Sequence, residues 1–227
     1  MKFVVTAGPT REHLDPVRFL SNPSTGKMGF AVARAAAMRG HEVALVAGPV
    51  SLKTPKGVRR IDVTSAREML AAVEEEMSKA KSGKPTVFVA TAAVADWRPA
   101  KCAARKLKKG QMSDKLKLVR NPDILKEIGR RTKTVHSSNH PLTHSPTYLV
   151  GFAAETNDVI AEARRKCREK NLDMIVANDV TEKGSGFGVD TNRVTFVRKD
   201  GSVERLPLMT KLAVARRIVR ECEDLCP

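Results

Sequence analysis

The chain has 227 residues, of which 41% are hydrophobic and 29% charged, a composition that is ordinary for a globular protein with a sizeable core. No apolar run approaches the ~20 residues that a membrane-spanning helix needs, and the first residues lack the apolar stretch of a signal peptide. We therefore expect no membrane partner. The four cysteines are too few and too irregularly spaced for a disulfide framework, which favours a reducing cytoplasm.

The formal net charge of +16 calls for an explanation. Nucleic acid, a small polyanionic substrate and a merely solvated basic surface would each account for it. Proteins that bind RNA usually add stacking aromatic side chains, whereas aromatics here are 4%, with one Trp and one Tyr. We expect no nucleic-acid partner, although charge alone does not decide between the other two explanations.

Predicted strands and helices alternate along most of the chain. The predicted strands are 2–7, 42–47, 59–62, 86–91, 148–152 and 174–177, and the predicted helices are 29–39, 66–81, 122–131 and 158–170. Several strand segments are almost continuously apolar, as in strands that are buried on both faces. The pattern predicts an α/β protein: a Rossmann-like, doubly wound three-layer sandwich around a mostly parallel sheet.

The pattern changes after residue 190. Two alternating segments, 193–198 and 203–208, flank Lys199-Asp200-Gly201, and an Asp-Gly pair is a strong hairpin signal. Thr210 then provides a cap for a last helix, 211–223. We expect a C-terminal antiparallel hairpin on the parallel sheet, and one domain over residues 1–227.

Two segments show no periodic pattern. Residues 95–119 are rich in lysine and include Lys106-Leu107-Lys108-Lys109-Gly110, which we interpret as a flexible strap. Residues 132–147 are rich in Ser, Thr, His and Pro and are expected to form a surface insertion. Its histidines at 136, 140 and 144 have the spacing of a metal site on a helix, but Pro141 and Pro146 argue against that helix and favour an exposed loop.

The junction between the first strand and the first helix, residues 7–29, is crowded with Gly, Pro, Ser, Thr and Asn. In open α/β sheets, ligands bind at the carboxyl ends of strands, where Arg18, Lys27 and backbone N–H groups could meet an anion. The P-loop pattern fails, because Ser21 and Met28 stand where it needs glycine and Ser or Thr. G-x-G-x-x-G is also absent. The junction therefore predicts an anion site of another design.

Further candidates follow the later strands. Small residues at 92, 93, 153 and 154 either admit a ligand to the backbone or merely allow tight helix–sheet packing. Lys166 and Lys170 share one helix face, and in isolation a solvated face is the simpler interpretation. Lys106 alone would be an ordinary surface lysine. Asp96 could cap a turn, bind a ribose hydroxyl or bind a metal ion.

Taken in chain order, several motifs resemble one family. They are Asp15-Pro16-Val17-Arg18-Phe19-Leu20-Ser21-Asn22 with Ser24, Gly26-Lys27-Met28-Gly29, Ala92-Ala93-Val94-Ala95-Asp96-Trp97-Arg98-Pro99, Lys106-Leu107-Lys108-Lys109, Asn121-Pro122-Asp123-Ile124-Leu125, Gly151-Phe152-Ala153-Ala154-Glu155-Thr156, Asn178-Asp179, and Gly186-Phe187-Gly188 with Asp190 and Asn192. This set is similar to that of the phosphopantothenate–cysteine ligases (phosphopantothenoylcysteine synthetases). In many bacteria this unit follows a flavin-dependent decarboxylase; with nothing before Met1, we expect a stand-alone bacterial-type synthetase or an excised domain.

The resemblance implies a reaction in coenzyme A biosynthesis. The family joins 4′-phosphopantothenate to L-cysteine through an acyl-nucleotidyl intermediate and releases pyrophosphate and a nucleoside monophosphate. Its co-substrate is CTP in typical bacterial members and ATP in eukaryotic ones; the bacterial-like motifs here favour CTP. The resemblance also implies Mg²⁺ and a homodimer. The alternative of another class, an NAD(P)-binding reductase of the Rossmann type, lacks both the glycine fingerprint and a catalytic Tyr.

The resemblance also implies roles for individual residues. Lys106 would assist formation of the intermediate, Asn22 would bind the intermediate and promote its attack by cysteine, and Arg18 would either touch substrate or brace the loop. The implied nucleotide site comprises Ala90, Thr91, Ala92, Asp96, Lys106, Pro122, Asp123, Ile124, Leu125, Phe152, Lys166 and Lys170, with Asp96 also the candidate for the metal. The implied substrate site comprises Asn22, Ser24, Gly26, Lys27, Ala92 and Ala93.

Overall fold

The computed structural model describes residues 1–79, 83–108, 115–137 and 146–226, and an eight-stranded sheet is its centre. The strands of this sheet are β1 (Lys2–Ala7), β4 (Glu42–Ala47), β5 (Arg59–Asp62), β6 (Thr86–Ala90), β9 (Thr147–Glu155), β10 (Met174–Asp179), β12 (Thr195–Arg198) and β13 (Val203–Arg205). Their order is β13-β12-β10-β9-β6-β1-β4-β5. The six strands from β10 to β5 are parallel, and β12 and β13 add the predicted antiparallel edge.

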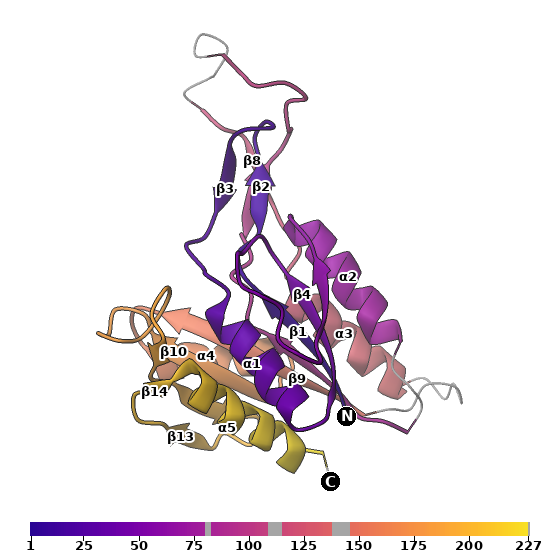
Figure 1. Cartoon of the computed structure of the whole chain (residues 1–227), viewed down its shortest axis with the longest axis vertical. Coiled ribbons are helices and arrows are strands. Elements are labelled where there is room, and N and C mark those ends of the chain that lie inside the picture. Colours follow the sequence, from indigo (N-terminus) through magenta and orange to yellow (C-terminus); the bar gives the residue numbers. More distant parts are fainter. Residues whose placement is uncertain (80–82, 109–114, 138–145, 227) are drawn as a thin grey trace.

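Helices cover both faces of the sheet (Figure 1). One face carries α1 (Lys27–Met38) and α5 (Lys211–Asp224), and the other carries α2 (Ala66–Ser78), α3 (Ile124–Ser137) and α4 (Val159–Glu169). In β1, Phe3 and Val5 pack toward α1 and α5, whereas Val4 packs toward α2, so both faces of the strand are buried. The predicted three-layer fold is confirmed. None of the described helices is long and apolar enough to cross a membrane.

The strand order reverses between β1 and β6, because β4 and β5 lie on one side of β1 while β6, β9 and β10 lie on the other. Ligands of open α/β sheets bind at such a switch point. Here the loop after β1 and the loop after β6 are joined directly. Ala93 donates its N–H to the carbonyl of Gly8 at 2.9 Å, and Pro9 forms a β-bridge with Ala93. A ligand at this edge must therefore lie beside the joined loops rather than between them.

Two antiparallel ribbons stand out from the body of the molecule (Figure 1). In the first, β2 (Arg11–His13) pairs with β3 (Phe19–Ser21); in the second, β7 (Trp97–Pro99) pairs with β8 (Leu118–Arg120). We call these ribbons and the described residues between their strands the arm. A further pair, β11 (Thr191–Asn192) with β14 (Met209–Thr210), lies beside the start of α5.

The predicted limits of two irregular segments were wrong. Residues 95–119, for which no strand was predicted, carry β7 and β8 at their ends, and the Arg120 guanidinium lies 5.3 Å from the centre of the Trp97 ring. Pairing across so long a gap leaves no turn signal in the sequence. The third helix does not stop at residue 131 but continues to Ser137, because no Gly or Pro interrupts 132–137. His140 and His144 lie outside the described residues.

A buried carboxylate on α2 forms ion pairs at the amino-terminal edge of the sheet, which is opposite to the edge that carries the candidate site residues. Glu76 on α2 forms ion pairs with Lys2, Arg59 and Lys79, and its side chain is only 3% exposed. Burial by itself would raise the pKa of Glu76. Hydrogen bonds from Arg59 and Lys79, together with the charges of Arg59 and Lys2, outweigh burial and lower that pKa from 4.5 to about 2.

Glu76→Gln should lower the free energy of unfolding at pH 7 by about 3 kcal/mol, since a depressed carboxyl pKa stabilises the folded state above the unfolded pKa. The difference from the parent should shrink as the pH falls from 4.5 toward about 2. Urea unfolding across this range measures it. Glu75→Gln is the matched control, because Glu75 also pairs with Lys79 but is 67% exposed. Equal losses in the two variants would contradict the prediction.

Candidate functional site

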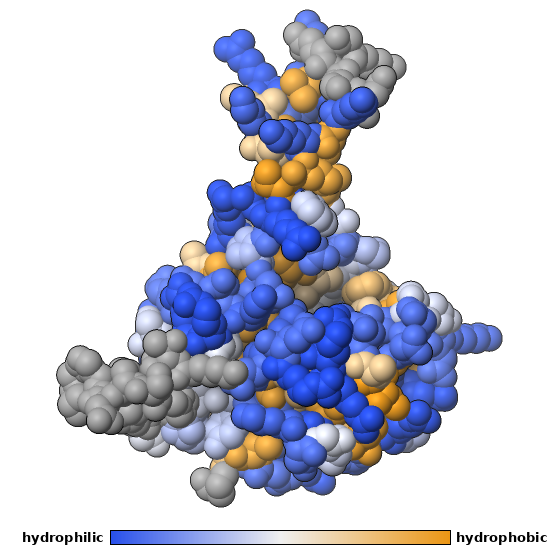
Figure 2. Space-filling view, turned by 180° about the vertical axis from the view of Figure 1, so that it is seen from behind, coloured by the Kyte–Doolittle hydropathy of each residue, from blue (hydrophilic) through white to orange (hydrophobic). Residues whose placement is uncertain are grey.

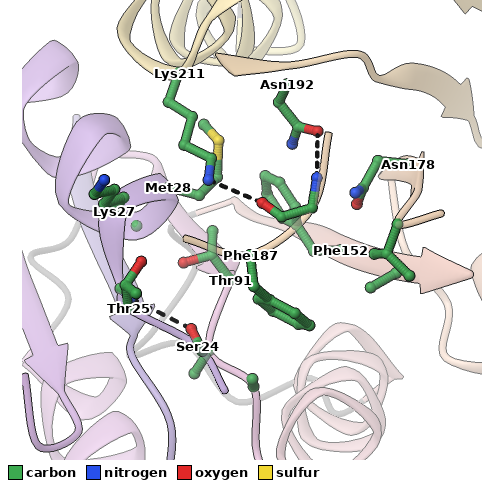
Figure 3. A pocket seen from close by; sticks show the side chains of 17 residues that line it. Ser24, Thr25, Lys27, Met28, Thr91, Phe152, Asn178, Phe187, Asn192 and Lys211 are labelled. Carbon is green, nitrogen blue, oxygen red and sulfur yellow. Dashed lines mark hydrogen bonds between the residues drawn. The ribbon is translucent and has the colours of Figure 1, made fainter. Parts of the chain in front are cut away.

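A pocket of about 130 Å³ opens at the carboxyl edge of the sheet, on the side of α1 and α5 (Figure 3). This volume is below the ~300 Å³ at which pockets for whole small molecules begin, and it suits a group of about the size of a phosphate. The lining residues come from the ends of β6, β9 and β10, the starts of α1 and α5, and the turn at 186–192. They are Ser24, Thr25, Gly26, Lys27, Met28, Gly29, Thr91, Ala92, Ala93, Phe152, Ala154, Asn178, Val180, Gly186, Phe187, Asn192 and Lys211.

The amino-terminal end of α1 forms one wall of the pocket. Gly26 caps the helix with a φ of 77°, and the first turn contains no acidic residue. The first-turn N–H groups therefore remain directed at the pocket, where they favour an anion. Gly29 permits this placement, because a Cβ atom there would lie 2.3 Å from the Thr91 Oγ1 atom. The close contact of α1 with Thr91, just after β6, and with the end of β1 thus requires glycine at this position.

The turn at 186–192 forms the opposite wall. Asn192 Oδ1 accepts hydrogen bonds from Ser185 Oγ at 2.6 Å and from the Gly186 N–H at 3.5 Å. Its carbonyl oxygen is therefore used inside the turn, and its NH₂ group is left toward the pocket (Figure 3). Asn192 belongs to the family motifs of this turn, together with Gly186, Phe187, Gly188 and Asp190, but none of them was predicted as a site residue.

Two lysines hold the same turn. Lys211 donates to the carbonyls of Gly186 at 2.9 Å and of Val189 at 2.6 Å. Lys27 donates to the Gly188 carbonyl at 2.8 Å and pairs with Asp190 at 2.7 Å. The hydrogen bond and charge of Lys27 lower the pKa of Asp190. Sequence reasoning missed Lys211, because nothing near it in the chain shows that it reaches a turn 22 to 25 residues away.

Most of the predicted substrate site meets at this pocket. Ser24, Gly26, Lys27, Ala92 and Ala93 all line it. Asn22 does not, but its amide Nδ2 donates to the Ala93 carbonyl at 3.1 Å, which places it beside the same segment. That segment is in turn fixed to β1, since the Ala92 N–H contacts Thr6 Oγ1 at 3.3 Å.

The predicted nucleotide site is spread more widely. Thr91, Ala92 and Phe152 line the pocket, and Ala90 ends β6 next to Gly151. Ile124 and Leu125 are buried in the core between α3 and the sheet, so only their backbone can reach a ligand. Pro122 lines a separate hollow together with Arg98, Arg120 and Asn121.

The lysine pair at the carboxyl end of α4, Lys166 in the last turn and Lys170 at the cap, is not simply solvated. Lys166 forms an ion pair with Glu155 at the end of β9, and Lys170 pairs with Asp123 at 2.8 Å, just before α3. Both ammonium groups therefore reach carboxylates at the carboxyl edge of the sheet, since Glu155 is the last residue of β9 and Asp123 directly precedes α3. They lie on the face of α3 and α4, opposite to the pocket at α1.

Asp96 and Lys106 are both exposed. The backbone carbonyl of Asp96 accepts the Asn121 N–H at 2.8 Å, which ties the base of β7 to the end of β8. In the part of the chain that the structure describes, no three His, Cys, Asp or Glu side chains gather as a metal site. A single carboxylate such as Asp96 can still hold Mg²⁺ when substrate phosphates and water supply the other ligands.

Arg18 braces the arm. Its guanidinium pairs with the fully buried Asp15 at 2.5 Å and donates to the Leu107 carbonyl at 2.7 Å. Burial would raise the pKa of Asp15, but hydrogen bonds from Arg18, Val17 and Leu107 hold it well below its usual range. Of the two roles left open for Arg18, the geometry favours bracing, because Leu107 is the neighbour of Lys106.

The sheet order, together with a small pocket at a helix start, defines a Rossmann-like α/β protein with a candidate anion site. Residues 1–225 match the family described as the DNA/pantothenate metabolism flavoprotein C-terminal domain. The chain belongs to this family.

Curated relatives and a solved structure agree with this assignment. The chain is 48% identical over 220 residues to the coenzyme A biosynthesis bifunctional protein CoaBC of Vibrio cholerae and 48% identical over 223 residues to that of Bacillus subtilis, covering 96% and 98% of this chain but 51% of each relative. It thus spans about half the length of these relatives. A crystal structure of the C-terminal domain of CoaBC matches with a TM-score of 0.77 and 41% identity, covering 99% of this chain and 94% of that one.

A more distant structure shares the fold. A Cab2 mutant in complex with phosphopantothenate-cysteine matches with a TM-score of 0.73 at 17% identity, covering 97% of this chain and 84% of that one.

Proposed function

We propose that the protein is a phosphopantothenate–cysteine ligase of coenzyme A biosynthesis. The observation that carries this proposal is the pocket for a phosphate-sized anion, joined through Ala93 to the Asn22 side chain. Membership of a family whose relatives are coenzyme A biosynthesis proteins supports it. The substrates are 4′-phosphopantothenate, L-cysteine and a nucleoside triphosphate.

The geometry supports a position for each part of the substrate and an order for the two chemical steps. The substrate phosphate lies in the pocket, on the first-turn N–H groups of α1 and beside Lys27. The pantothenate carboxylate then extends along Ala92 and Ala93 toward Asn22. A carboxylate is a poor electrophile, so it is first joined to the nucleotide α-phosphate, with loss of pyrophosphate. The cysteine amine then displaces the nucleoside monophosphate, and positioning and charge neutralisation supply most of the rate.

The nucleotide is proposed to lie across the ends of β6 and β9, with its triphosphate toward Lys166 and Lys170. Both lysines already meet carboxylates, so a triphosphate would have to share or replace Glu155 and Asp123 as their partners. Mg²⁺ neutralises triphosphate charge when bound, and Asp96 is the proposed protein ligand. We propose CTP rather than ATP as the co-substrate.

Pyrophosphate release tests the function. The protein should release pyrophosphate from CTP only when phosphopantothenate and Mg²⁺ are both present, and product should form only after cysteine is added. Parallel reactions with ATP at equal concentration decide the base preference. Absence of pyrophosphate with either nucleotide would reject the ligase assignment.

We also propose a homodimer that forms through the arm. The arm exposes large apolar side chains that a solitary projecting element would not need, and Figure 2 shows hydrophobic surface gathered along it. They are Val17, Phe19, Trp97, Leu116 and Leu118. Sedimentation velocity should give twice the mass of the chain, and a monomer at micromolar concentration would reject the proposal.

The compartment is proposed to be the reducing cytoplasm. All four cysteines, Cys102, Cys167, Cys222 and Cys226, are free thiols in the structure. Burial raises the pKa of the Cys226 thiol to about 11, so this group is protonated at neutral pH and poorly reactive.

A further inference from the structure

Lys211 is a charged side chain enclosed in the wall of the pocket. It is only 6% exposed, although it is the first residue of α5. Figure 3 shows the side chain reaching from α5 to the turn at 186–189, on the side of the pocket opposite to Thr25 and Ser24. Lysine is almost never buried to this extent unless its charge is matched by a partner. Its partner must therefore be identified.

The described protein groups match this charge only in part. An ammonium group has three N–H donors, and Lys211 uses two of them on the carbonyls of Gly186 and Val189. No carboxylate among the described residues forms an ion pair with it. The nearby carboxylate of Asp190 is already paired with Lys27. Lys211 thus lines the pocket with one N–H donor beyond the two that these carbonyls accept.

We propose that Lys211 binds the phosphate of the substrate directly through its third N–H, while the carbonyls of Gly186 and Val189 hold the ammonium in place. This inference rests on the proposed function. It adds Lys211, near the carboxyl terminus of the chain, to Lys27 as a second cation for the substrate phosphate. The phosphate would then lie between the start of α1 on one side and Lys211 and the Asn192 amide on the other.

The local charges support this assignment. Burial lowers the pKa of Lys211, the charge of Lys27 lowers it further, and Asp190 opposes them. Two like charges beside one pocket repel each other unless an anion lies between them. A phosphate carrying about two negative charges removes this repulsion and satisfies the free donor. The turn itself needs glycine at 186 and 188, where φ is 89° and 77°, to offer its carbonyls in this way.

Calorimetric titration of the whole chain with 4′-phosphopantothenate and with pantothenate tests the proposal. Lys211→Met keeps the length and apolar stem of the side chain but removes the charge. It should weaken phosphopantothenate binding by about 10- to 100-fold, the worth of one hydrogen bond to a charged group. Pantothenate, which lacks the phosphate, should bind both proteins within about twofold of each other.

Lys84→Met is the matched control, because Lys84 is an exposed lysine that precedes β6, at the opposite end of the sheet. It should leave both affinities unchanged. An equal loss of affinity for phosphopantothenate and pantothenate in Lys211→Met would mean that Lys211 only shapes the turn. An unchanged affinity for phosphopantothenate would mean that Lys211 does not contact the phosphate. Either result overturns the proposal.

Two further measurements keep the outcomes distinct. If Lys211→Met does not fold, the Nζ signal of Lys211 in the ¹⁵N-lysine-labelled parent, assigned with Lys211→Arg, should shift with phosphopantothenate but not with pantothenate; an unmoved signal overturns the proposal. If the parent shows no ligase turnover, inorganic phosphate replaces phosphopantothenate as the probe. A loss of phosphate binding in Lys211→Met would then support the Lys211 site although the proposed function has failed.

Discussion

Replacement of Lys106 by glutamine should slow formation of the acyl-nucleotidyl intermediate by about 10²- to 10³-fold, the usual effect of removing one group that stabilises charge in a transition state. Lys106 is exposed on the arm and its neighbour Leu107 is tethered by Arg18 and Asp15. The substitution should therefore leave the free energy of unfolding within about 0.5 kcal/mol of the parent. Rapid quench after mixing with CTP and phosphopantothenate, followed by mass spectrometry of the acyl-nucleotide, measures the step directly.

Lys101→Gln provides the matched control, since Lys101 is also an exposed lysine of the arm, after β7. It should form the intermediate at the parental rate. An unchanged rate in Lys106→Gln would remove Lys106 from the chemistry. Equal slowing in both variants would instead indicate that the overall charge of the arm matters, rather than one ammonium group.

Asn22→Asp should have the opposite signature: the acyl-nucleotidyl intermediate should accumulate, because its attack by cysteine slows by about 10²- to 10³-fold. The Asn22 amide donates to the Ala93 carbonyl at 3.1 Å. An aspartate cannot donate this bond, and its charge repels both the carbonyl and an anionic intermediate. Single-turnover reactions with and without cysteine separate the two chemical steps.

Ser21→Ala controls for the loss of a local hydrogen bond, since Ser21 donates to the Thr10 carbonyl at 2.8 Å from the neighbouring position. It should turn over without accumulation of the intermediate. Failure of Asn22→Asp to accumulate the intermediate, with a normal rate of pyrophosphate release, would show that Asn22 does not act in the second step.

Much of the fold could be predicted because the core strands carry their own signal. In β1, every residue is buried, so an apolar run bounded by a glycine-rich junction identified it correctly. The hairpin of β12 and β13 was found from its Asp-Gly turn. The ribbon of β7 and β8 was not, because its strands are three residues each and their pairing partner is about twenty residues away.

In the candidate site, too, features within one segment could be predicted, whereas contacts between distant segments could not. Residues 24–29 were predicted as an anion site because a glycine-rich segment leads into a helix, and they line the pocket. The bracing role of Arg18 could not be chosen from sequence, because it depends on the Leu107 carbonyl, 89 residues further along the chain. The partners of Lys166 and Lys170 were hidden for the same reason, since Glu155 and Asp123 belong to other elements.

By itself, the sequence determined the layered α/β fold, the resemblance to one family of ligases and the wall of the pocket at the start of α1. Each of these depends on local patterns of polarity and turn residues. Only the tertiary structure decided what faces that wall. Lys211 and Asn192 reach the pocket through α5 and a turn after β10, and their contacts with Gly186 exist only once these segments pack beside α1. Packing across the sheet brings distant charges together, and no short stretch of sequence records such a contact.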